Sequence, residues 1–116
     1  MRRSASVRFS VAAVVLGALL IPGGAAADRE LCVRGAKFRG ASVDLDVKNV
    51  DIHDVFRLLA DAGRANLVVS DQVAGKVTLR IKRTPWDQIA CAVAALHRLT
   101  ISVDGTVLIV RPTPRG

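Results

Sequence analysis

The stretch of sequence that decides the fold is VDLDVKNVDIHDVFRLLADAGRANLVVS, residues 43–70. In residues 43–47 valine and leucine alternate with aspartate, and this period-2 pattern predicts a strand with one solvent-facing side. The apolar residues that follow recur at helical spacing, and they are Ile52, Val55, Phe56, Leu59 and Ala62. Residues 66–70, NLVVS, then predict a short buried strand.

Both ends of this predicted helix have local signals. Asp51 precedes the first apolar position, so its carboxylate is expected to accept a hydrogen bond from a free amide of the first turn. Gly63 follows the last apolar position and is expected to end the helix in the left-handed conformation.

The second half of the chain repeats the change from strand to helix. In residues 77–82 valine, leucine and isoleucine alternate with polar residues. Thr84 is then predicted to be the N-cap of a second helix, with Pro85 at the first helical position. This helix is expected to run to about His97 and to bury one stripe of side chains, which are Trp86, Ile89, Val93 and Leu96.

The chain closes with a predicted hairpin, in which residues 99–103 and 106–110 flank the turn signal Asp104-Gly105. The expected register pairs Val103 with Thr106, Ile101 with Leu108 and Leu99 with Val110. The whole order is strand, helix, strand, strand, helix, strand, strand. It predicts the α+β class, a small βαββαββ sandwich in which two helices pack against short mixed sheets.

Residues 43–112 resemble the N-terminal short domain shared by secretins and TonB-dependent transducers. The resemblance lies in the run from Asn49 to Ala60, in NLVVS at 66–70, in Gly75-Lys76-Val77-Thr78-Leu79, and in Thr84-Pro85-Trp86-Asp87-Gln88. The chain is similar in particular to the version of this domain in type IV pilus secretins.

The resemblance implies a non-catalytic interaction domain in the cell envelope. In secretins the similar domain lies at the periplasmic mouth of the outer-membrane ring and touches inner-membrane components. In TonB-dependent transducers it signals to an anti-sigma regulator. A secretin continues for hundreds of residues beyond this domain, whereas the sequence ends at Gly116. We therefore expect that the chain does not form a pore by itself.

Residues 1–27 have the features of a secretory signal peptide, with a basic start, a short apolar run and Ala25-Ala26-Ala27. Cleavage is predicted between Ala27 and Asp28, and an uncleaved anchor is the alternative. The apolar run is shorter than the roughly twenty residues that span a bilayer. The mature chain would then comprise an N-terminal extension at 28–42, the domain at 43–112 and a tail at 113–116. The extension is expected to be loosely ordered, with a short strand around residues 36–38.

The charge of the chain does not indicate a nucleic-acid partner. Removal of Arg2, Arg3 and Arg8 with the signal peptide lowers the formal net charge from +7 to +4. The sequence also has no Tyr and no strand that combines aromatic with basic residues, as base-stacking domains do. Export and composition together predict a protein partner in the cell envelope and no nucleic acid.

The two cysteines, Cys32 and Cys91, are the most distinctive residues of the predicted mature chain. Their separation excludes a C-x-x-C redox or zinc motif, and cysteines in an oxidising compartment usually pair. Cys91 is predicted to point away from the buried stripe of its helix. We therefore hypothesise a Cys32–Cys91 disulfide that fixes the extension over that helix. The alternative is a buried Cys91 with an unpaired or intermolecular Cys32.

The remaining polar residues favour structural roles. His53 and His97 lack a metal-ligand spacing, and the acidic residues Asp44, Asp46, Asp51 and Asp54 are expected to form a solvated face. Trp86 is assigned to the core rather than to a partner surface. No catalytic residue, cofactor or metal site is predicted.

A partner-binding surface is predicted at the last strand. Small sheets leave open edges that can accept a partner strand, and the candidate edge is Thr106, Val107, Leu108, Ile109 and Val110. The basic stripe of Lys76, Arg80 and Lys82 is interpreted as a solvated face.

Together these features predict a non-catalytic periplasmic module. It would be associated with an outer-membrane secretin, or with a pilus, secretion or TonB-type uptake system. Two alternatives remain open: a signalling module that contacts an anti-sigma regulator, and a truncated secretin fragment without an independent role.

Overall fold

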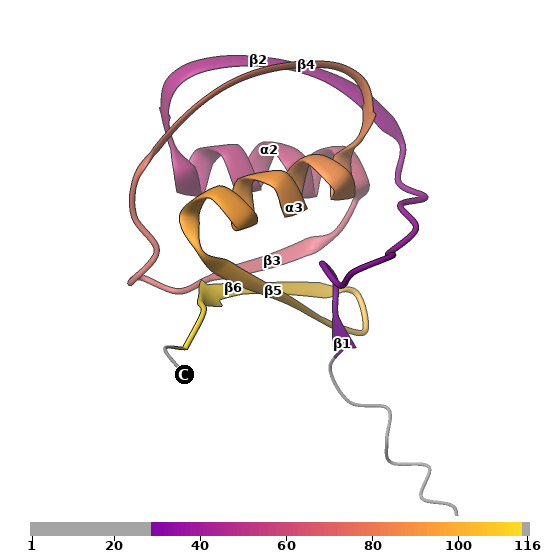
Figure 1. The fold of residues 1–116 in the computed structure, drawn as a ribbon, viewed down its shortest axis with the longest axis vertical. Coiled ribbons are helices and arrows are strands. Elements are labelled where there is room, and N and C mark those ends of the chain that lie inside the picture. Colours follow the sequence, from indigo (N-terminus) through magenta and orange to yellow (C-terminus); the bar gives the residue numbers. More distant parts are fainter. Residues whose placement is uncertain (1–28, 115–116) are drawn as a thin grey trace, which may run out of the picture.

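Two helices lie between two sheets in the computed structural model, which describes residues 29–114 (Figure 1). The elements are β1 (Arg29–Glu30), β2 (Ser42–Asp51), α2 (Ile52–Gly63), β3 (Asn66–Val69), β4 (Lys76–Pro85), α3 (Trp86–His97), β5 (Leu99–Asp104) and β6 (Val107–Pro112). The predicted α+β class and the βαββαββ order are therefore confirmed from Ser42 onward. The predicted signal peptide, with its cleavage site between Ala27 and Asp28, lies outside the described residues.

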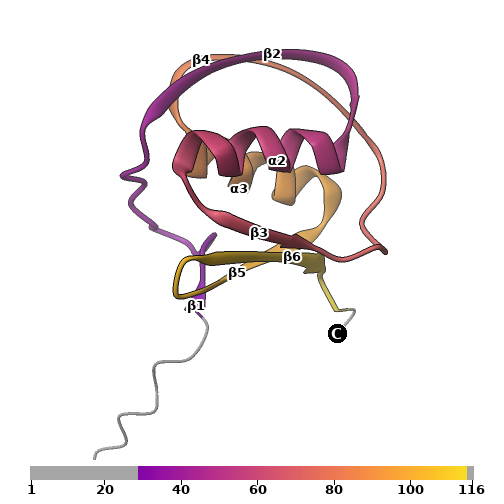
Figure 2. The same ribbon diagram turned by 180° about the vertical axis from the view of Figure 1, so that it is seen from behind.

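The two sheets differ in size and cover opposite sides of the helix pair. β2 and β4 form an antiparallel two-stranded ribbon, whereas the larger sheet has the order β1-β5-β6-β3. Figure 2 shows the ribbon curving over the helices and the larger sheet beneath them. Within the larger sheet β3 runs parallel to β6, and the other pairs are antiparallel.

The core is built from the inner faces of both helices and both sheets. Its largest fully buried side chains are Phe56, Ile52, Ile89, Ile101, Val55 and Val110. Burial of an aliphatic or aromatic side chain of this size stabilises a fold by about 1.5–3 kcal/mol. The helical patterns of the sequence predicted four of these residues, Ile52, Val55, Phe56 and Ile89, on the apolar faces of the two helices.

Helix α2 begins as predicted and ends one residue later than predicted. Asp51 Oδ1 accepts a hydrogen bond of 2.8 Å from the backbone N–H of His53, so Asp51 is the N-cap. The left-handed residue at the other end is Arg64, with φ 55°, and not Gly63. The glycine is needed for a different reason, because a Cβ at Gly63 would overlap the indole ring of Trp86.

Helix α3 departs from its predicted start. Thr84 belongs to β4, and its hydroxyl donates to the carbonyl of Lys82 instead of capping the helix. Pro85 stands at the N-cap, where no side chain accepts a hydrogen bond. The backbone N–H of Trp86 donates instead to the carbonyl of Ala41 at 3.0 Å.

The buried face of α3 is also not the predicted one. Leu96 was expected in the core but is 75% exposed, whereas Ala90 and Ala94 are buried. At 100° per residue, the buried face is turned by roughly 70° from the predicted stripe. The small alanine side chains explain the difference, because they allow α3 to approach its neighbours closely.

The closing hairpin has a register two residues away from the predicted one. Asp104 pairs with Val107 and Ile101 pairs with Val110, so Gly105 and Thr106 form the turn. A shift by two residues leaves every side chain on its predicted face of the sheet. Gly105 has φ 63°, a conformation that glycine adopts at little cost.

Candidate interaction surfaces

The N-terminal extension is fixed to the domain at several points. Cys32 and Cys91 form a disulfide with a Cα–Cα distance of 5.5 Å. Beside it, β1 pairs with β5, and the N–H of Leu31 donates to the carbonyl of Ile101 at 2.8 Å. Residues 29–42 of the extension are therefore held against the domain, and the strand lies at 29–30 rather than at the expected residues 36–38. The cysteines that the sequence hypothesis paired are the two that are bonded in the structure.

Trp86 joins this extension to the core. A Cβ on either Gly40 or Gly63 would overlap the indole, so the ring occupies a slot between two glycines from different parts of the chain. The N–H of Gly40 also donates to Asp87 Oδ1 at 3.3 Å, and Asp87 is only 9% exposed. Trp86 is partly buried and packs against the core cluster, so it has a structural role. Its ring is also held in place by the extension.

The strand predicted as a partner-binding edge, Thr106–Val110, does not lie at an edge of its sheet. β6 pairs with β5 on one side and with β3 on the other, so its backbone groups are already used. The sequence could not show this, because the parallel pairing of β3 with β6 joins segments about forty residues apart. Among residues 29–114, β3 is the last strand at one edge of this sheet, and the opposite edge is covered in part by β1.

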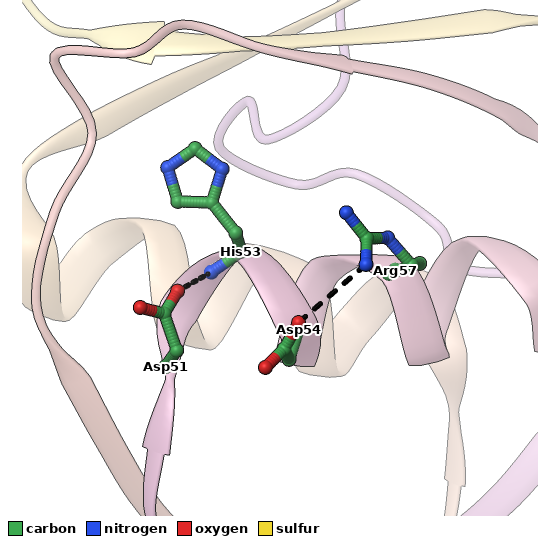
Figure 3. Close-up of polar contacts among 4 residues, drawn as sticks. All are labelled: Asp51, His53, Asp54 and Arg57. Atoms are coloured by element: carbon green, nitrogen blue, oxygen red, sulfur yellow. Dashed lines mark hydrogen bonds and ion pairs between the residues drawn. The ribbon is translucent and has the colours of Figure 1, made fainter.

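The acidic residues near the start of α2 have separate structural partners. Figure 3 shows Asp51 at the N-cap, beside His53, and an ion pair of 3.6 Å between Asp54 and Arg57. Both side chains of this ion pair are largely exposed, so it contributes at most about 1 kcal/mol. Asp44 Oδ1 accepts a 2.7 Å hydrogen bond from the N–H of Arg83.

The basic stripe on β4 is accompanied by acidic residues. Lys76, Arg80 and Lys82 are exposed, and Asp46 of β2 lies directly opposite Arg80 in the ladder. The outer face of the ribbon therefore has mixed charge, and it is not a uniform basic patch.

The histidines occupy different parts of the domain. His53 Nε2 lies 2.7 Å from the carbonyl oxygen of Val73, which fixes the loop between β3 and β4. His97 Nε2 is buried, and residues 29–114 supply no hydrogen-bond partner for it. Among these residues, no group of three or more His, Cys, Asp or Glu side chains could hold a metal ion.

Grooves in the described part of the chain lie beside the larger sheet. The first has a volume of about 350 Å³ and lies between α2 and β3, and its lining includes His53, Arg57, Asp61 and Leu67. The second, of about 290 Å³, lies where the extension meets Trp86 and the β5–β6 turn. Neither helix in the described part of the chain is long and apolar enough to cross a membrane.

Comparison with curated proteins finds secretin components of type IV pili. The chain is 35% identical over 75 residues to the type IV pilus biogenesis and competence protein PilQ of Neisseria gonorrhoeae, and 37% identical over 75 residues to the fimbrial assembly protein PilQ of Pseudomonas aeruginosa. These matches cover 65% of this chain and 10% of each relative. The chain is also 34% identical over 100 residues to the DNA utilization protein HofQ of Escherichia coli, of which it covers 21%. No family model matches the chain.

Solved structures of secretins match the fold of this chain. The N0 domain of the type II secretin from enterotoxigenic Escherichia coli matches with a TM-score of 0.55 and 16% identity, over 60% of this chain and 93% of that chain. The V. cholerae type IV competence pilus secretin PilQ matches with a TM-score of 0.54 and 35% identity, over 59% of this chain and 16% of that chain.

The class of domain follows from these comparisons. The predicted resemblance to the N-terminal short domain of secretins is confirmed, and the fold is that of a secretin N0 domain. Within that class, the identity to PilQ confirms the particular similarity to type IV pilus secretins. The chain spans about a tenth of the length of the PilQ relatives that it matches.

Proposed function

We propose that the chain is an exported, non-catalytic module that binds a protein partner in a type IV pilus or related secretin system. The main support is the agreement of sequence and fold, because the chain is 35–37% identical to PilQ over 75 residues and also matches the fold of an N0 domain. The proposal assigns neither a catalytic residue nor a cofactor to the chain.

Location in the periplasm is part of the same proposal. The basic and apolar pattern of residues 1–27 favours export. The Cys32–Cys91 disulfide also favours an oxidising compartment, since structural disulfides are rare in the cytosol. Partners of this kind are expected at the outer membrane or at the inner-membrane base of the same machine.

The proposal is tested by affinity purification of the tagged chain from cross-linked cell envelopes, with partners identified by mass spectrometry. A matched control lacks residues 1–27 and otherwise has the same sequence. We expect a secretin or another pilus-machine component with the exported form alone. Recovery of an anti-sigma regulator in its place would favour the signalling alternative. Recovery of the same proteins with both forms would contradict the proposal.

A further inference from the structure

We propose that the Cys32–Cys91 disulfide is a redox latch, which a protein dithiol opens so that residues 29–41 are released from a domain that stays folded. These residues precede the segment 43–112 that resembles secretin domains. The inference goes beyond the proposed function, because it assigns a regulatory device to the extension whichever partner the domain binds.

The core of the domain does not depend on the extension. Every fully buried side chain of the core cluster belongs to residues 52–110, and within the extension only Leu31 and Cys32 pack against this cluster. Both of these residues are partly exposed. Figure 1 shows the segment between β1 and β2 passing along the side of the two layers. Detachment of the extension therefore removes peripheral contacts and leaves the helices and the other strands packed.

Apart from the disulfide, few contacts hold the extension. Strand β1 has two residues, and beside it the N–H of Leu31 donates to the carbonyl of Ile101 at 2.8 Å. The N–H of Gly40 donates to Asp87 Oδ1 at 3.3 Å. Among residues 29–114, no ion pair joins the extension to the domain. Since hydrogen bonds at the surface compete with water, these contacts are too few to offset the conformational entropy that the released extension gains.

The bridge lies at the surface of the domain, in basic surroundings. Cys32 and Cys91 are both partly exposed, so an attacking thiolate approaches the bridge without unfolding the core. Within residues 29–39 one acidic residue, Glu30, stands against four exposed basic residues, which are Arg29, Arg34, Lys37 and Arg39. Positive charge stabilises the thiolate that leaves when a disulfide is attacked, so these surroundings favour reduction.

The reaction that opens the latch is thiol–disulfide exchange. One thiolate of the protein dithiol attacks a sulfur atom of the bridge, the Cys32–Cys91 bond breaks, and a mixed disulfide forms. The second thiolate of the reductant then attacks its own sulfur in the mixed disulfide and releases the other cysteine. In total, two electrons and two protons pass from the dithiol to Cys32 and Cys91, and the reductant becomes a disulfide. The reverse exchange, with an oxidised protein dithiol, closes the latch.

Opening the latch changes the surroundings of Trp86. The indole lies between Gly40 of the extension and Gly63 of α2. The groove beside it is lined on one side by Arg29 and Leu31, which belong to the extension. When residues 29–41 are released, the groove loses this wall and the indole becomes accessible to solvent from the side of Gly40. The latch therefore switches the surface at the start of α3 between a closed and an open form.

The test is reduction of the exported protein with dithiothreitol in the absence of denaturant. Thiols are counted by alkylation and mass spectrometry, and amide hydrogen exchange is measured in parallel. We expect two alkylated cysteines, with exchange at Leu31 and Gly40 faster by about tenfold or more and exchange at Leu59 and Val93 unchanged. Oxidised glutathione should restore the protection. If thiols form only in urea that unfolds the core, or if the reduced protein keeps Leu31 and Gly40 protected, the disulfide is not a latch.

The double variant Cys32→Ser, Cys91→Ser is the matched control, because it represents the released form without thiols. Its Leu31 and Gly40 amides should exchange as fast as those of the reduced wild-type protein, and dithiothreitol should not change them. Acrylamide quenching of the single tryptophan, Trp86, should rise when the wild-type protein is reduced and stay constant in the double variant. Loss of protection at Leu59 and Val93 in the reduced protein would overturn the proposal, because the bridge would then be needed for the fold itself.

A protein reductant tests whether the bridge is opened by the proposed class of partner. Thioredoxin should yield the same two alkylated cysteines, and a thioredoxin that lacks its second cysteine should be trapped as a mixed disulfide with the chain. Absence of both reduction and trapping would refute the latch. The proposed function is tested separately by partner capture, so a failed capture would leave the latch intact, and a latch that does not open would leave the proposed function intact.

Discussion

Removal of the disulfide should destabilise the protein by an amount set by the loop that it closes. Cys32 and Cys91 are 59 residues apart. Loop-closure entropy predicts that a crosslink over this separation stabilises the folded state by about 4 kcal/mol. This value is an upper limit, because the bridge fixes the extension and not the core directly. If the reduced extension detaches while the domain stays folded, the loss of stability is limited to the free energy of the other contacts between the extension and the domain.

The double variant Cys32→Ser, Cys91→Ser tests this reasoning by urea unfolding. Trp86 is the single tryptophan of the chain, and its indole lies against Gly40, so its fluorescence reports both detachment of the extension and global unfolding. Hydrogen exchange at the amides of Leu31 and Gly40 separates the two events. We expect a lower urea midpoint and faster exchange at both amides. An unchanged midpoint with both amides still protected would refute the reasoning, as would two free thiols in the non-reduced wild-type protein.

Other substitutions test the packing of the helices. Ile89→Ala should cost about 2–5 kcal/mol in urea unfolding, because its side chain is fully buried, whereas Leu96→Ala should change stability by less than about 0.5 kcal/mol. Equal losses of stability in these two variants would favour the predicted buried stripe, which included Leu96. Asp51→Ala should cost about 1 kcal/mol by removing the N-cap of α2, and Asp51→Asn should recover most of it. Gly63→Ala should lower the thermal midpoint and alter Trp86 fluorescence, since the new methyl group overlaps the indole. An unaltered spectrum would contradict the glycine slot.

The sequence was sufficient for features that depend on neighbours along the chain. The strand at 43–47, the capping role of Asp51 and the inward face of α2 follow from local periodicity and side-chain chemistry, and each was predicted correctly. Errors arose where distant segments meet. Thr84 does not cap α3 as predicted, because β4 continues to Pro85, which lies opposite Ser42 of β2.

The candidate surface was mispredicted for the same reason. Whether β6 is an edge depends on β3, and no local pattern distinguishes a hairpin strand that stays at an edge from one that acquires a parallel neighbour. Leu96 shows a related limit, since counting large apolar residues overlooked the two alanines on which α3 packs. By contrast, Cys32 and Cys91 were paired by reasoning about compartment, which does not require the sheet topology.

The position of the disulfide has a mechanical consequence. If a machine pulled on the two ends of this domain, the tension would pass from Cys32 to Cys91 through the sulfur atoms, and α2, β3 and β4 would bear none of it. Fully extended, residues 29–114 could reach about 300 Å without the bridge but only about 100 Å with it. The oxidised domain would therefore act as a tether of limited length, which yields a short distance under load and then holds.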